Sequence, residues 1–184
     1  MSSPAASTVS VGGVLRRFRR SRGGSAAVEF ALVAPLFFAL LFAIIETAMM
    51  FFATQVLETI TANSARQILT GQTQTANLTQ AQFQANVVCP QIPALFTCAN
   101  VAIDVESWPA FSGAMTVTSL IDANCNFITA NLQYNPGGPG SIVLVKLAYQ
   151  WPLFVTGLGF NISSPGCTNK RLIMAAAAFQ NEPY

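Results

Sequence analysis

The most constraining feature of this chain is a lone glutamate at the start of a long apolar run. Residues 22–30 read Arg-Gly-Gly-Ser-Ala-Ala-Val-Glu-Phe, so Glu29 follows five residues after Gly24. From Phe30 to Ile45 the chain carries no charged residue. An uncompensated carboxylate in hydrocarbon costs several kcal/mol, so a carboxylate at the edge of such a run indicates a functional role.

The apolar run is long enough to cross a membrane. It extends over 24 residues from Phe30 to Ala53, or about 36 Å of helix at 1.5 Å per residue. A cleaved signal peptide has a shorter apolar region, of roughly 7–15 residues, and an A-x-A-like exit that is missing here. We therefore predict a basic leader over residues 1–24 and a transmembrane helix over residues 25–54, bent at Pro35.

The charge distribution predicts the orientation of this helix. Five of the nine basic residues precede Gly24 and no acidic residue does; they are Arg16, Arg17, Arg19, Arg20 and Arg22. Such a cluster before an apolar span places that end in the cytoplasm. The prediction is a single-pass protein of the inner (cytoplasmic) membrane with a periplasmic or extracellular C-terminal domain. Nucleic acid is not an expected partner, because no folded basic surface accompanies the cluster.

Residues 55–184 are expected to form the exported domain, which begins by continuing the helix. Val56, Leu57, Ile60 and Ile68 fall within one arc of an amphipathic helix, and Gly71 is a suitable stop. Residues 72–77 are polar and predict a loop. Thr79-Gln80-Ala81-Gln82 then matches a capping box, which predicts a short helix that ends at Pro90.

The remaining segments alternate as strands do. Strands are predicted at 101–106, more weakly at 115–121, and at 141–151 and 170–180, with a turn at 135–140. Asp104 and Glu106 alternate with apolar residues, so we expect them on a solvated face. The fold class is α+β, with a long N-terminal transmembrane helix continuing into an exported domain that contains a small antiparallel sheet.

All four cysteines lie beyond the apolar run, in a compartment that permits disulfides. Four cysteines allow three pairings. Cys89 with Cys98 is favoured, because it closes a short loop, and Cys125 with Cys167 would follow. Structural disulfides are favoured over free or reactive thiols.

Catalytic chemistry has little support in the sequence. The chain has no histidine, which excludes Ser-His and Cys-His catalysis and imidazole ligands. No C-x-x-C pattern or phosphate-binding loop is present, so no catalytic residue, metal or cofactor is predicted. An exported enzyme is the least favoured of the functions considered.

The segment Gly24–Gly71 resembles the TadE-like family of the tight-adherence (Flp) pilus system. The resemblance rests on Gly24-Ser25-Ala26-Ala27-Val28-Glu29-Phe30-Ala31-Leu32-Val33-Ala34-Pro35, Ile44-Ile45-Glu46 and Ala62-Asn63-Ser64-Ala65-Arg66, with softer likeness at Pro136–Gly140, Trp151–Phe154 and Phe179–Tyr184. It implies a minor pilin-like protein, or pseudopilin, needed to assemble an adhesion pilus. Its implied partners are the membrane, a prepilin peptidase, other pilins and pilus assembly proteins.

The resemblance also implies roles for residues of the N-terminal motif. The peptidase would cut between Gly24 and Ser25, and Glu29, followed by Phe30, would seat the subunit in the filament base. The alternative function is an uncleaved single-span anchor that carries an exported binding or sensing domain. The mature N-terminus distinguishes the two, because the pilin function requires Ser25 there.

Overall fold

A computed structural model describes residues 24–111, 118–155 and 161–184, which divide into two units. The first ends at Phe42 and the second comprises Ala43–Tyr184. Helix α2 (Ser25–Leu69) contributes to both and continues through Pro35. Its apolar part is long and apolar enough to cross a membrane, and the first unit exposes large apolar side chains such as Phe30, Leu32 and Leu36.

The second part of α2 is one layer of the second unit. Its buried positions recur every three or four residues, as the sequence predicted, and include Ala53, Leu57, Ile60, Ala65 and Ile68. The helix stops because Gly71 adopts a left-handed φ of 73°. The last carbonyls of the helix find partners beyond it. The Glu182 N–H donates to the Leu69 carbonyl, and the Gly71 N–H and the Gln74 side-chain amide both donate to the Ile68 carbonyl.

Short helical pieces follow α2. The expected loop at 72–77 is instead partly helical, since α3 (Gln72–Thr75) forms a single turn in which the Thr75 hydroxyl donates to the Gly71 carbonyl. The capping box is confirmed: the Thr79 and Gln82 side chains each accept a hydrogen bond from the other's backbone N–H at the start of α4 (Gln80–Phe83).

The predicted end of this second helix needs correction. After α4 the chain continues as a π-helix (Gln84–Val88) and a 3₁₀ turn (Cys89–Gln91), so helical structure passes through Pro90. Proline is accommodated because it lies in the first turn of that 3₁₀ segment, where its missing N–H is not needed. Two further 3₁₀ turns occupy Cys98–Asn100 and Thr129–Asn131.

The three described strands form one antiparallel sheet in the order β1-β2-β3. They are β1 (Ala102–Trp108), β2 (Ile142–Pro152) and β3 (Lys170–Gln180). The register pairs Val105 with Val145 and Val145 with Ala177. The weaker strand expected at 115–121 lies partly outside the described residues; in its described part, Ile121 forms an isolated bridge with Phe127.

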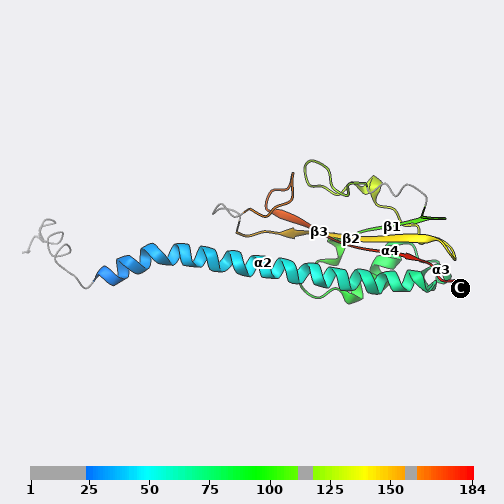
Figure 1. Cartoon of the computed structure of the whole chain (residues 1–184), viewed down its shortest axis with the longest axis horizontal. Coiled ribbons are helices and arrows are strands. Elements are labelled where there is room, and N and C mark those ends of the chain that lie inside the picture. Colours follow the sequence, from blue (N-terminus) through cyan, green and yellow to red (C-terminus); the bar gives the residue numbers. More distant parts are fainter. Residues whose placement is uncertain (1–23, 112–117, 156–160) are drawn as a thin grey trace, which may run out of the picture. The chain divides into compact units, whose positions relative to one another are not determined.

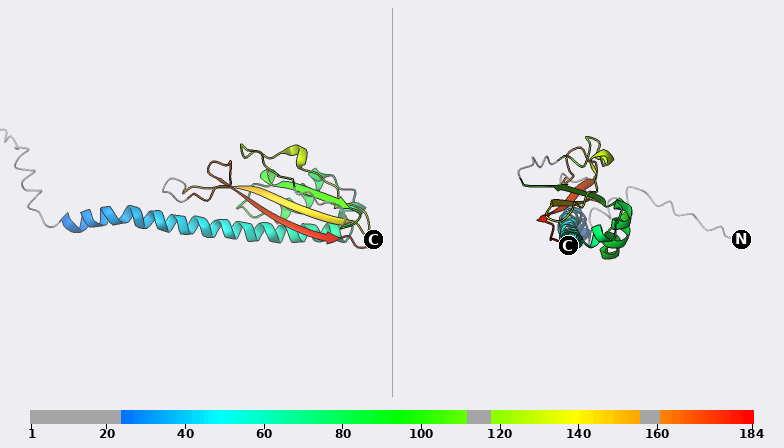
Figure 2. Two further views of the ribbon diagram at one scale, coloured as in Figure 1. Left: turned by 45° about the horizontal axis from the view of Figure 1, so that its top comes forward. Right: turned by 90° about the vertical axis from the view of Figure 1, so that its right-hand side faces the viewer.

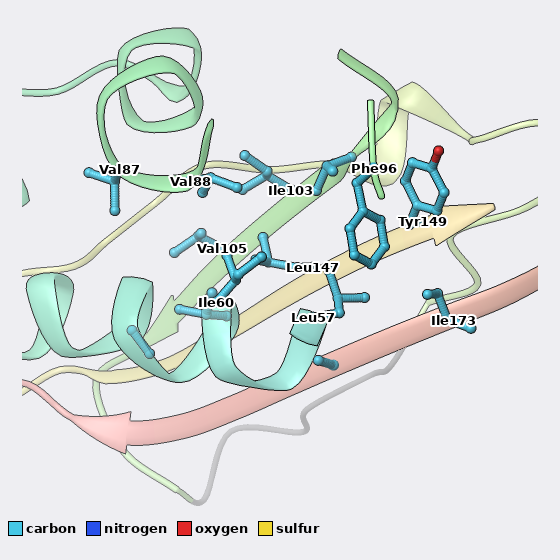
Figure 3. Close-up of a cluster of buried hydrophobic side chains, with 14 of the residues drawn as sticks. Leu57, Ile60, Val87, Val88, Phe96, Ile103, Val105, Leu147, Tyr149 and Ile173 are labelled. Atoms are coloured by element: carbon cyan, nitrogen blue, oxygen red, sulfur yellow. The ribbon is translucent and has the colours of Figure 1, made fainter. Parts of the chain in front are cut away.

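The main core fills the space between the sheet and the helices (Figure 3). Leu57 and Ile60 of α2, Val87 and Val88 of the π-helix, and Leu147 of β2 contribute to it. A second, smaller cluster lies on the other face of the sheet and joins Ala102, Leu120 and Ala148. The segment from 118 to 135 covers that second face (Figures 1 and 2), so the sheet is the middle layer of three and the α+β fold is confirmed.

Candidate functional site

The predicted processing junction coincides with a structural boundary. Helix α2 begins at Ser25, directly after Gly24, and both residues are exposed. A Cβ added at Gly24 would meet no described atom within 4 Å. The described fold therefore does not itself require glycine at this position.

Glu29 and Phe30 follow within the first turns of α2. The Ser25 hydroxyl donates a hydrogen bond of 2.9 Å to Glu29 Oε1, one helical turn away. Both Glu29 and Phe30 are exposed, and Phe30 retains 68% of its accessible surface. A carboxylate near a helix N-terminus is favoured by the helix dipole, and here it remains accessible to a partner.

Glu46 is the second carboxylate in the apolar run, and its environment is different. It is only 7% exposed. Its carboxylate accepts hydrogen bonds from the backbone N–H groups of Phe154 and Val155, the latter at 3.2 Å to each oxygen. The isolated charge is visible in the sequence. Its partners are main-chain N–H groups more than one hundred residues away, and no sequence pattern predicts such donors.

The C-terminal blocks of softer family likeness lie close to one another or to α2. The Asn181 amide donates to the carbonyls of Pro136 and Gly138, at 2.9 and 3.0 Å. The Tyr184 ring covers Gly71 so closely that a Cβ there would overlap it. The block at 151–154 meets α2 through Glu46. These segments thus fix the sheet to the helix.

The cysteines form two bonds, in the pairing that the sequence analysis favoured. Cys89 is bonded to Cys98, with Cα atoms 5.5 Å apart. Cys125 is bonded to Cys167, with Cα atoms 4.9 Å apart, and closes a loop of 42 residues. The first bond holds the 3₁₀ turn after the π-helix, and the second links the segment covering the sheet to the residues before β3.

The expectation that Asp104 and Glu106 form a solvated face is wrong. Asp104 is fully buried and lies 2.6 Å from the ammonium of Lys146, its partner across the β1–β2 register. Lys146 also contacts Glu106 at 2.7 Å, and the Gln133 N–H donates to Asp104 Oδ1 at 2.9 Å. Burial lowers the pKa of Lys146, but the two carboxylates outweigh it, so this pKa lies above its ordinary value.

This ion cluster sits on the sheet face opposite α2 and supports the fold rather than a reaction. Lys146 is only 2% exposed, and the segment at 133–135 runs along β1 beside it. A buried charge persists when it is paired and hydrogen-bonded. Charged groups were expected on this face, but exposed to solvent, because strand alternation alone does not reveal that a second layer covers it.

The comparisons with known proteins bear on α2. No curated protein and no solved structure matches this chain. Residues 24–66 match the family described as TadE-like protein, a segment that contains Gly24, Glu29 and Glu46. The family resemblance found in the sequence is thereby confirmed for the helix that carries the candidate processing and seating residues.

Proposed function

We propose that this protein is a minor pilin-like subunit, a pseudopilin, that takes part in assembling a tight-adherence pilus. One observation carries the proposal: Gly24, Ser25 and Glu29 occupy the threshold of a membrane-length helix within a TadE-like segment. The leader of residues 1–24 would remain cytoplasmic and the domain after residue 54 would be exported, consistent with the arginine cluster and with two disulfides beyond the span.

A prepilin peptidase would cut between Gly24 and Ser25 on the cytoplasmic side. Such an enzyme must draw an extended backbone into a narrow site, where a Cβ obstructs it. The exposed junction at the start of α2 suits this requirement. The new amino group at Ser25 of one subunit would then pair with Glu29 of a neighbour, because a carboxylate at a membrane threshold is stabilised by a well-matched cation.

Two substitutions separate cleavage from seating. Gly24→Val should leave full-length precursor in the membrane. Glu29→Ala should leave cleavage and insertion intact, since it only removes a charge from the apolar helix, while pilus assembly fails. Glu58→Ala is the matched control, because Glu58 is an exposed carboxylate of the same helix outside the motif.

The measurements are intact mass of the membrane-extracted protein and a count of pili. A wild-type mature protein that begins at Ser25 supports the pilin function. A mature protein that retains Arg16–Arg22, or normal pili in Glu29→Ala cells, would instead favour the uncleaved anchor with an exported binding or sensing domain.

A further inference from the structure

The loop at residues 153–155 lies against the apolar part of α2, within the predicted membrane span. Glu46, which holds this loop, falls eight residues before the end of the predicted span at residue 54, or about 12 Å of helical rise. Beyond Glu46 the helix still exposes Phe51 and Phe52, at 62% and 57%. The exposed apolar surface therefore extends past the level at which the loop is attached.

The attachment satisfies groups that hydrocarbon would leave unpaired. The N–H groups of Phe154 and Val155 donate to Glu46, and the N–H of Leu153 donates to the Asn169 carbonyl at 2.8 Å. Irregular backbone is tolerated at membrane depth only where its polar groups are paired. The same contacts offset part of the cost of placing the Glu46 carboxylate there, because it accepts hydrogen bonds from two main-chain N–H groups.

The side chains around this loop have the character of a membrane interface. Phe154 is 84% exposed, the largest exposure among the exposed large apolar residues described. Leu153 pairs by its backbone beside the start of β3, where Lys170 and Arg171 are exposed. An exposed aromatic ring suits the boundary between acyl chains and headgroups, and two neighbouring cations suit the anionic headgroups themselves.

We propose that the loop at residues 153–155 is a membrane-interface anchor, which inserts Phe154 into the outer leaflet and is positioned by Glu46. Lys170 and Arg171 contact the headgroups above it. The exported domain then contacts the bilayer surface until the subunit is taken from the membrane into a pilus. This proposal depends on α2 being a transmembrane helix, which the pilin and the uncleaved-anchor functions share, so it survives failure of the cleavage experiment.

The test places a tryptophan at position 154 in the full chain. Phe154→Trp is made in a Trp108→Phe/Trp151→Phe background and reconstituted into vesicles of phosphatidylethanolamine and phosphatidylglycerol carrying brominated acyl chains. Phe111→Trp in the same background is the control, since Phe111 is 70% exposed but follows β1 at the opposite end of the sheet. The probe at 154 should be blue-shifted and strongly quenched by bromines near the headgroups, and the control should not.

Two Glu46 variants test the positioning role. Glu46→Gln retains an oxygen that accepts the two N–H donors, so quenching at 154 should persist, whereas Glu46→Ala should reduce it. If the tryptophan background does not fold, p-cyanophenylalanine at 154 in the otherwise unaltered chain reports the same environment through its nitrile stretch. Quenching at 154 no greater than at 111, or a nitrile frequency equal to that in water, overturns the proposal. Contact with another subunit would then explain the exposed Phe154.

Discussion

Lys146→Met should be among the most damaging single substitutions in the unit formed by Ala43–Tyr184. The lysine ammonium pairs with Asp104 at 2.6 Å and with Glu106 at 2.7 Å, and the side chain of Asp104 has no exposed surface. Removing the cation leaves a fully buried carboxylate without its counter-charge, which typically costs about 3–5 kcal/mol. For a domain of this size the melting temperature should fall by roughly 10–20 °C.

Near-ultraviolet circular dichroism of the oxidised, detergent-solubilised full chain is the appropriate assay. It reports the packing of Tyr149 and Trp151, which lie in the main hydrophobic core, and is insensitive to helix that persists in detergent. Lys170→Met is the matched control, because Lys170 is exposed and its amine contacts the Gln150 side chain at 3.3 Å. This control should change stability by less than about 0.5 kcal/mol.

A compensating variant shows whether the mechanism is the uncompensated charge. Lys146→Met/Asp104→Asn removes the buried anion yet keeps an oxygen that accepts the hydrogen bond from the Gln133 N–H. It should recover more than half of the lost stability, since neutral replacements of buried ion pairs are well tolerated. Equal melting of Lys146→Met and Lys170→Met, or no recovery in the double variant, would refute this reasoning.

Three further measurements follow from the same domain. Replacing Cys89 and Cys98 by serine should cost about 2.5 kcal/mol and replacing Cys125 and Cys167 about 4, because the second loop is longer; denaturant unfolding in which the two losses are equal would contradict this. Burial raises the pKa of Tyr134 to about 12, although the neighbouring Thr73 side chain lowers it, and the pKa of Lys146 is also raised. The folded protein holds the Tyr134 proton more tightly than the unfolded chain, so this stabilisation is complete below about pH 10 and is lost as the pH rises toward 12. The raised pKa of Lys146 acts in the same direction. Thermal melts across this range should show Tyr134→Phe declining less steeply than wild type. Gly71→Ala should destabilise by more than about 1 kcal/mol, since φ is +73° and the new Cβ meets the Tyr184 ring, whereas Gly138→Ala, with open space at its Cβ, should be nearly neutral in the same melts.

Periodicity accounts for most of what the sequence predicted about the fold. The apolar arc from Leu57 to Ile68, the left-handed stop at Gly71 and the strands at 142–152 and 170–180 all lie where the patterns indicated. The apolar face of each of these elements packs into the same hydrophobic core, so the sequence pattern matches the observed burial.

The prediction of burial failed for Asp104, because a second layer packs on the sheet face where the alternation of β1 predicts solvent. Asp104 alternates with apolar neighbours as a solvated residue would, yet the segment at 133–135 pairs with the edge of β1, and its Gln133 N–H donates to the Asp104 carboxylate. A long irregular segment carries no periodic signal, so neither its position nor the burial of Lys146 follows from the strands alone. The single turn of α3 was missed for a related reason, because a helix of four residues is too short to show a period.

The two carboxylates of the apolar run show why a charge pattern indicates a site without defining its role. Glu46 is 7% exposed and accepts hydrogen bonds from the backbone of its own chain, so its requirement is met within the subunit. Glu29 is exposed and, among the described residues, accepts a hydrogen bond from the neighbouring Ser25 hydroxyl. A hydroxyl one turn away provides no counter-charge, so a carboxylate at the membrane threshold still gains from a cation. The surroundings of the two glutamates therefore differ: Glu46 joins the domain to its helix, whereas the Glu29 carboxylate remains exposed.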